Sequence, residues 1–262
     1  MISIFQFDLA ILLAIFAIML FAGLVHGTLG LGFPMVATPM LATMMDVRSA
    51  ILITLLPTVA VNLVSIFRSP SGLERLKPFH WLIGFSLAGS IIGSLVLAIS
   101  DPAPFRLMLA GLILLYLWNS LRISRLWLND NSRLAMLVFG LIAGFSAGTT
   151  NVMVAILIIY FLSLETPREN MVPALNACFF VGKASQIIVF SIVGLVGLMH
   201  FIETLPLALS AVLALRAGQY LHHRIDLKTY QSILKKLLAV LAAILIFQFL
   251  NETKVITNIS TF

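Results

Sequence analysis

Two short segments carry the residue types best suited to binding an anion. Ala22–Thr28 and Ala143–Thr149 share the pattern AGxxxGT, and the apolar sequence is interrupted at Gly30-Leu-Gly-Phe33 after the first and at Gly148-Thr-Thr-Asn151 in the second. Glycine and short polar side chains interrupt helices, and proline, here Pro34, is favoured in the first turn of a new helix. We therefore expect a broken helix at each segment.

The helix that begins after each break carries unpaired backbone N–H groups and roughly half a positive charge at its N-terminus. Two such N-termini that converge near the middle of a membrane form an anion site. The residues predicted to bind the substrate there are Thr28, Gly30, Gly32, Phe33, Thr149, Thr150 and Asn151. For the four glycines of the repeated pattern, Gly23, Gly27, Gly144 and Gly148, we instead favour close helix packing of the GxxxG kind.

Lys183 is the deepest cation of the chain. It lies about midway along an expected helix, with Asn176 and Gln186 nearby. Ionisable groups inside membranes are costly and are functional candidates by default, so the predicted site includes these three residues. The alternative is that Lys183 only binds buried carbonyl groups.

Three further basic residues lie near the breaks. His26 precedes the first break, where it could titrate, bind substrate or simply pack with a hydrogen bond. Arg48 and Arg168 follow the two short helices at the expected mouths. They could attract anions or anchor the protein at the membrane interface.

The elements that must position these residues are membrane helices. Of the 262 residues, 61% are hydrophobic and 10% are charged, and the mean hydropathy is +1.10. Continuous apolar runs, each close to the ~20 residues that cross a bilayer, indicate an all-α polytopic membrane protein in contact with lipid. The net charge of +6 is divided among short clusters between the spans, so no nucleic-acid partner is expected. The single Cys178 excludes an internal disulfide, and neither a metal nor a cofactor is predicted.

Lysine and arginine clusters predict the topology. The clusters are Arg68, Arg75 and Lys77; Arg122, Arg125 and Arg133; and Arg224, Lys228, Lys235 and Lys236. By the positive-inside rule all three face the cytoplasm. Both termini are therefore expected outside.

The pattern of elements repeats at an offset of 120 to 125 residues, so that Gly23 matches Gly144 and Asp101 matches Asp226. The first repeat covers 1–125, with a hairpin at 8–45 and helices at 47–67, 78–99 and 103–121; the second covers 126–262, with a hairpin at 134–164 and helices at 169–198, 201–223 and 229–250. Each half crosses the membrane an odd number of times, so we expect two inverted repeats with 8–10 membrane helices in total, whether the hairpins cross fully or re-enter. Inverted repeats with broken helices are typical of transporters.

Two other functions stay open. The run Gly144-Phe-Ser-Ala-Gly148 matches the GxSxG pattern of serine hydrolases, which would make Ser146 the nucleophile of an intramembrane protease, although the glycines have helical spacing. Proton-coupled uptake of a small organic acid through His26 is the second. No Asp or Glu lies deep in a span, which disfavours carboxylate-based coupling. Export of an anion needs no coupling ion, because the membrane potential supplies ~2.3 kcal/mol per charge per 100 mV.

The segment Gly30-Leu-Gly-Phe-Pro-Met-Val-Ala-Thr-Pro39-Met-Leu41 resembles the GxGGGxxxxPxL motif of the TauE/SafE sulfite-exporter-like family, also called the toluene sulfonate uptake permease family. Gly30, Gly32, Pro39 and Leu41 match, whereas Phe33 and Pro34 replace glycines of the motif. The second copy has Thr149-Thr-Asn151 in place of glycines and Tyr160 in place of the proline. The resemblance implies a permease of the bacterial inner membrane for a small anion such as sulfite, a sulfonate or sulfoacetate. A homodimer is a further expectation.

Overall fold

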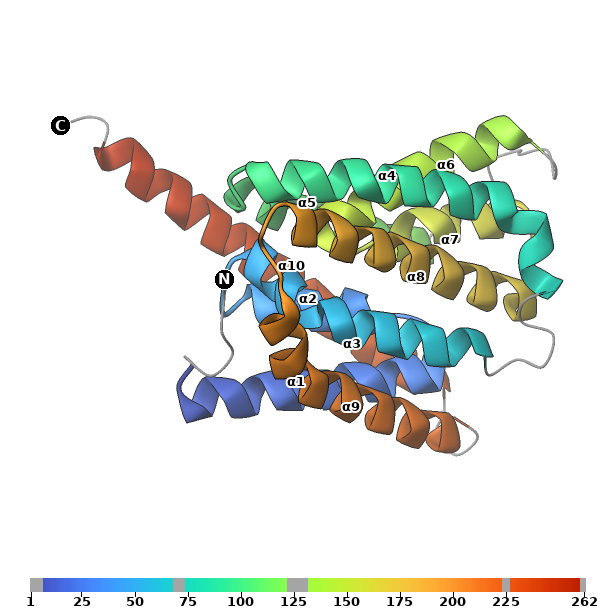
Figure 1. The fold of residues 1–262 in the computed structure, drawn as a ribbon, viewed down its shortest axis with the longest axis horizontal. Coiled ribbons are helices and arrows are strands. Elements are labelled where there is room, and N and C mark those ends of the chain that lie inside the picture. Colours follow the sequence, from blue (N-terminus) through green and yellow to red (C-terminus); the bar gives the residue numbers. More distant parts are fainter. Residues whose placement is uncertain (1–6, 68–73, 122–131, 223–226, 260–262) are drawn as a thin grey trace.

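The computed structural model describes residues 7–67, 74–121, 132–222 and 227–259, and these residues form helices joined by short turns (Figure 1). The helices are α1 (Leu9–Leu29), α2 (Phe33–Ala42), α3 (Val47–Phe67), α4 (His80–Ile99), α5 (Ala103–Leu121), α6 (Arg133–Thr150), α7 (Val154–Ser163), α8 (Arg168–Ile192), α9 (Leu198–Leu221) and α10 (Leu227–Ile259), with a 3₁₀ helix, η2 (Glu74–Phe79), before α4. Within the described residues, seven helices are long and apolar enough to cross a membrane. The all-α, multi-pass fold class is therefore confirmed.

At both breaks a residue in the left-handed conformation ends the first helix, but the residue type differs. At the first, Gly30 (φ +81°) ends α1, its N–H donates to the carbonyl of His26 at 2.7 Å, and Gly32 (φ +108°) precedes α2. At the second, Asn151 (φ +64°) ends α6, and its N–H donates to the carbonyl of Ala147 at 3.1 Å. Glycine and asparagine are the residues that adopt this left-handed conformation most readily.

The helices that follow the breaks are short. Both α2 and α7 have 10 residues, which corresponds to about 15 Å, half of the ~30 Å hydrocarbon thickness. Each hairpin therefore joins one long helix to one half-length helix.

The repeated glycines bring helices into backbone contact. A Cβ atom at Gly23 would lie 2.4 Å from the carbonyl oxygen of Ala211, and one at Gly27 would lie 2.1 Å from that of Leu215, so α1 packs parallel to α9. In the same way, Gly144 and Gly148 of α6 lie against the carbonyls of Ser86 and Ser90, so α6 packs parallel to α4. The prediction that these glycines pack helices is confirmed.

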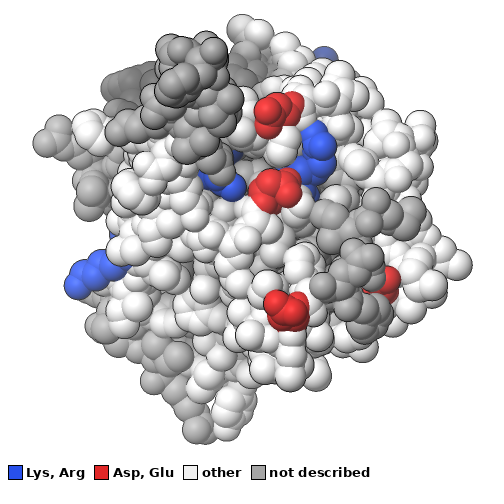
Figure 2. All heavy atoms as spheres, turned by 90° about the vertical axis from the view of Figure 1, so that its left-hand side faces the viewer, with Lys and Arg blue, Asp and Glu red and all other residues white. Residues whose placement is uncertain are grey.

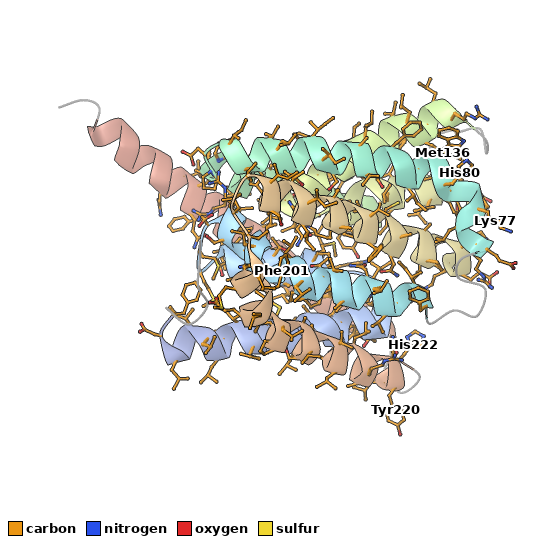
Figure 3. All side chains as sticks on the ribbon, in the orientation of Figure 1. Lys77, His80, Met136, Phe201, Tyr220 and His222 are labelled. Atoms are coloured by element: carbon orange, nitrogen blue, oxygen red, sulfur yellow. The ribbon has the colours of Figure 1, made fainter. Side chains whose placement is uncertain are left out.

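The two ends of the helix bundle differ in charge. We call one the basic end; it holds Arg75, Lys77, Arg133 and Arg168, and Figure 3 labels Lys77 and His222 there. Figure 2 views the opposite end, where acidic and basic groups lie scattered over a mainly uncharged surface. Arg68, Arg122, Arg125 and Arg224, which also entered the topology prediction, lie outside the described residues.

Helices α1 and α6, the first of each predicted half, run in opposite directions in Figure 1. A half-length helix follows each, and further long helices follow that. The predicted boundary between 125 and 126 lies outside the described residues. The inverted repeat itself stays a prediction.

Candidate functional site

The first break forms part of the wall of a cavity at the basic end. The cavity has a volume of about 560 Å³ and is lined by Gly27, Thr28, Leu29, Gly30, Ser65, Arg75, Arg168, Glu169, Val172, Pro173 and His222. These residues come from the end of α1, the end of α3, the start of α8, the end of α9 and the 3₁₀ helix before α4. The cavity is large enough for a small anion with its water.

Helix α8 fixes the backbone of the first break. Arg168, in its first turn, donates to the carbonyl of Leu29 at 2.7 Å, and Asn176 donates to the carbonyl of Gly30 at 3.1 Å. The carbonyl of Thr28 is 2.6 Å from Nδ1 of His222, and the Thr28 hydroxyl donates to the carbonyl of Leu24 at 2.8 Å. Three predicted residues, Thr28, Gly30 and Arg168, therefore line this cavity together, and Asn176 lies behind it.

The cavity carries positive charge. Arg75 and Glu169 form an ion pair at 3.0 Å, and Arg75 also donates to the Glu169 carbonyl at 3.0 Å. That carbonyl lacks its usual helical donor because Pro173, four residues later, has no N–H. Among the described residues Arg168 has no carboxylate partner, so its charge is available to an anion.

His26 binds the start of the second helix of this hairpin. The Phe33 N–H donates to Nδ1 at 3.2 Å, so Nδ1 is an acceptor, and Nε2 lies 3.0 Å from the hydroxyl of Ser65. That hydroxyl donates to the carbonyl of Val61 at 2.8 Å, so it accepts from the imidazole. Because His26 takes the Phe33 N–H and Pro34 has none, the N-terminus of α2 offers fewer free donors than we expected. The positive charge here comes chiefly from Arg168.

The second break is sealed inside the protein. The side chains of Thr149, Thr150 and Asn151 are fully buried. The Asn151 amide donates to the hydroxyls of Thr38 at 2.8 Å and Thr54 at 3.1 Å. The hydroxyls of Thr149 and Thr150 donate to carbonyls within α6. This break is therefore held by side chains from α2 and α3.

Lys183 lies beside the second break and is 1% exposed. Its ammonium group donates to the Ala147 carbonyl at 3.4 Å and to the side-chain oxygen of Gln186, and Gln186 donates to the Gly148 carbonyl at 2.7 Å. Both side chains thus hold the last turn of α6, as in the structural alternative that the sequence left open. Neither an Asp nor a Glu forms an ion pair with Lys183 among the described residues.

The two breaks contact different turns of α3. Ser65 contacts the first through His26, and Thr54 contacts the second through Asn151. These two contact residues lie about 16 Å apart along the helix axis. The second break also contacts α2 through Thr38, five residues after Phe33 at the first break, and the convergence of the two breaks stays a prediction.

The side chains of Arg48 and Ser146 bind helix carbonyls, which favours structural roles for both. At the opposite end, Arg48 donates to the carbonyls of Leu97 at 3.0 Å and of Ser100, which close the last turn of α4. Ser146 is 2% exposed, and its hydroxyl donates to the Ile142 carbonyl within the continuous helix α6. Neither the anion-gathering role of Arg48 nor the nucleophile hypothesis for Ser146 gains support from these contacts.

Several polar residues at the two breaks were missed in the sequence. Thr38, Thr54, Ser65 and His222 contact the breaks, and Arg75 lines the cavity. The regular spacing of polar side chains in 47–67 was a signal that could have identified two of them.

Comparison with known proteins gives one match. The family model described as Sulfite exporter TauE/SafE matches residues 15–249. No curated protein and no solved structure matches the chain. The matched region includes both breaks, the cavity residues and Lys183.

Proposed function

Because the chain belongs to the sulfite exporter TauE/SafE family, we propose that this multi-pass membrane protein is a permease that exports a small sulfur oxyanion or organosulfonate, such as sulfite or sulfoacetate. It acts in the bacterial inner membrane and is no enzyme. The observation that carries the proposal is the cavity of about 560 Å³ at the first break, into which Arg168 brings a charge with no described carboxylate partner.

The basic end faces the cytoplasm in this proposal, as the positive-inside rule requires. The anion enters the cavity from that side and meets Arg168 together with the backbone of the first break. It then passes toward the second break and Lys183. Since their contact residues on α3, Ser65 and Thr54, are about 16 Å apart along that helix, the two breaks act on the anion in turn.

Inverted halves would explain why the chain contains two breaks. The opposite directions of α1 and α6 (Figure 1) support this arrangement. In transporters of this kind, one half rocks against the other to open the site to each side. The open first break and the sealed second break then correspond to a state that faces the cytoplasm.

The proposal is tested with purified protein in proteoliposomes under an imposed membrane potential. Flux is measured for sulfite, thiosulfate, sulfate, sulfoacetate and taurine, with acetate as a carboxylate comparison. We expect a sulfur oxyanion or sulfonate to move faster than acetate. Flux of acetate alone, or of none of these compounds, would refute the proposed substrate class.

A pair of arginine variants tests the cavity. Arg168→Gln should raise the half-saturating anion concentration about tenfold, the equivalent of ~1.4 kcal/mol. Arg133→Gln is the matched control, because Arg133 lies at the same end but stacks over Trp81 at 5.3 Å, away from the cavity lining. Equal effects of the two variants would remove Arg168 from the site.

A further inference from the structure

One face of α3 carries a line of polar side chains. Thr54, Thr58, Asn62 and Ser65 occupy successive turns of this otherwise apolar helix. At 3.6 residues per turn they fall within about 80° of arc. The first three are 0% exposed, so the face is directed into the protein.

The ends of this line are attached to the two breaks. Thr54 accepts a hydrogen bond of 3.1 Å from Asn151 of the second break. Ser65 lies 3.0 Å from Nε2 of His26, beside the first break, and lines the cavity. The line thus runs about 16 Å, more than half of the ~30 Å hydrocarbon thickness.

Helix α8, which packs against α3, repeats this arrangement. Its residue Asn176 binds the Gly30 carbonyl at the first break, and Gln186 binds the Gly148 carbonyl beside the second. Lys183 lies between them on the same face. Two polar faces therefore connect the same pair of breaks.

The middle of the α3 line has unsatisfied polar atoms. The Thr58 hydroxyl and the side-chain oxygen of Asn62 have no hydrogen-bond partner among the described residues. The Asn62 amide nitrogen donates to the Thr58 carbonyl at 2.7 Å, which identifies the oxygen as the free atom. Buried polar groups are rarely left unpaired, because each one has lost its hydrogen bonds to water without replacement and destabilises the folded state.

Other buried threonines avoid this cost. The hydroxyls of Thr28, Thr54 and Thr150 each donate to the carbonyl four residues earlier in their helices. Thr58 has the same opportunity but makes no such bond. A retained cost midway between two functional breaks indicates a partner that is present only during the transport cycle.

We propose that Thr58 and Asn62 line the transport path and contact the oxyanion as it moves between the two breaks. This proposal rests on the proposed function. The Thr58 hydroxyl donates to an oxygen of the anion. The Asn62 oxygen accepts from the water that the anion carries or from an O–H group of a protonated oxyanion. No site residue predicted from the sequence lies on this face of α3.

The first experiment separates transport from stability. Thr58→Val keeps the side-chain shape and removes the unpaired hydroxyl, so we expect an equal or higher melting temperature and a flux at least fivefold lower. Thr54→Val is the structural control: it loses the bond from Asn151 and should lower the melting temperature. A Thr58→Val protein with normal flux, or with a melting temperature lowered as in Thr54→Val, would overturn the proposal.

The second experiment measures access directly and needs no transport. In a Cys178→Ala background, single cysteines are placed at Ser65, Asn62 and Thr58, with Leu63, which is 36% exposed and on another face, as control. The probe is 2-sulfonatoethyl methanethiosulfonate, an anionic thiol reagent, applied to the basic end. We expect the labelling rate to decrease from Ser65 to Asn62 to Thr58. At each of these positions the anionic reagent should react faster than the cationic 2-(trimethylammonium)ethyl methanethiosulfonate.

Labelling at Ser65 alone would overturn the path while leaving the cavity and the proposed function intact. Labelling at all three positions in a protein that moves no sulfur anion would instead refute the proposed function and retain the path. The two failures are thus distinguishable.

Discussion

The two breaks share a left-handed residue at the end of the first helix and differ in their surroundings. At the first, Gly30 and Gly32 adopt the left-handed conformation, and Gly30 borders a cavity. At the second, Asn151 adopts it, and its side chain is buried against α2 and α3. The first is open to solvent from one end and the second is closed. The same short sequence pattern thus precedes two breaks with different surroundings, one beside a cavity and one buried.

The two breaks also differ in the cation beside them. Arg168 at the first break lines the cavity, whereas Lys183 at the second is buried and binds the Ala147 carbonyl and the side-chain oxygen of Gln186. An anion that reached the second break would have to draw Lys183 away from these two oxygens. The second break can therefore serve as the occupied site only after its hydrogen bonds rearrange.

The largest expected effect comes from removing the cation of the second break. Lys183→Met should lower anion flux by at least about 100-fold, the equivalent of ~2.8 kcal/mol, while the protein stays folded by size-exclusion chromatography. Gln186→Leu is the comparison, since it removes the bond to the Gly148 carbonyl and the side-chain acceptor of Lys183 but leaves the cation in place. If the two variants have equally lowered melting temperatures and equal anion fluxes, Lys183 has only a structural role.

Next comes the side chain that seals the second break. Asn151→Gly still permits the left-handed backbone but removes the donor to Thr38 and Thr54, so we expect a loss of about 1–3 kcal/mol in unfolding free energy. Chemical unfolding in detergent measures it. A variant as stable as the wild type would mean that the second break does not depend on this side chain.

At the first break the backbone conformation should matter most. Gly32→Ala places a Cβ in open space, since no atom lies within 4 Å, but at φ +108° it should cost about 1–2 kcal/mol. Gly32→Asn should recover part of that loss, because asparagine tolerates positive φ better. Equal stability of all three proteins would show that the first break is not constrained in this way.

A smaller effect is expected at the opposite end. Arg48→Gln should lower the unfolding free energy by about 1 kcal/mol through lost bonds to the end of α4. The half-saturating anion concentration should stay constant, in contrast to Arg168→Gln. A shift in that concentration would restore an anion-gathering role to Arg48.

The smallest effect on anion flux is expected from a pH gradient. Both ring nitrogens of His26 are occupied by Phe33 and Ser65, so proton-coupled uptake would have to break one of these bonds. An inward pH gradient at constant membrane potential should therefore change flux less than twofold. Accumulation of a carboxylate driven by that gradient would favour the alternative that the sequence left open.

The sequence predicted the local features well, because they depend on local chemistry. The apolar runs identified a helical membrane protein. Glycine and proline at Gly30–Pro34, and the polar residues before Val152, located both breaks within a few residues. The GxxxG spacing of the repeated pattern predicted the helix packing that the contacts of Gly27 and Gly144 confirm.

Relations between distant segments could not be predicted. Arg48 and Arg168 occupy matching places in the predicted repeat, yet one binds the end of α4 and the other lines the cavity. Their difference arises from which helix ends lie beside them. Thr58 and Asn62 resembled isolated polar residues in an apolar helix until the contacts of Thr54 and Ser65 connected that helix to both breaks.

The parallel pairing of α1 with α9 also bears on how the protein is made. Helix α1 is synthesised first, whereas α9, which packs on its glycine face, is synthesised much later. Thr28 of α1 and Gly218 of α9, which share a hydrogen bond, are 190 residues apart. During synthesis that face must wait in lipid, or beside an insertion factor, until α9 emerges. Since α6 likewise packs on α4, a chain whose synthesis stops near residue 125 forms neither of these two helix pairs.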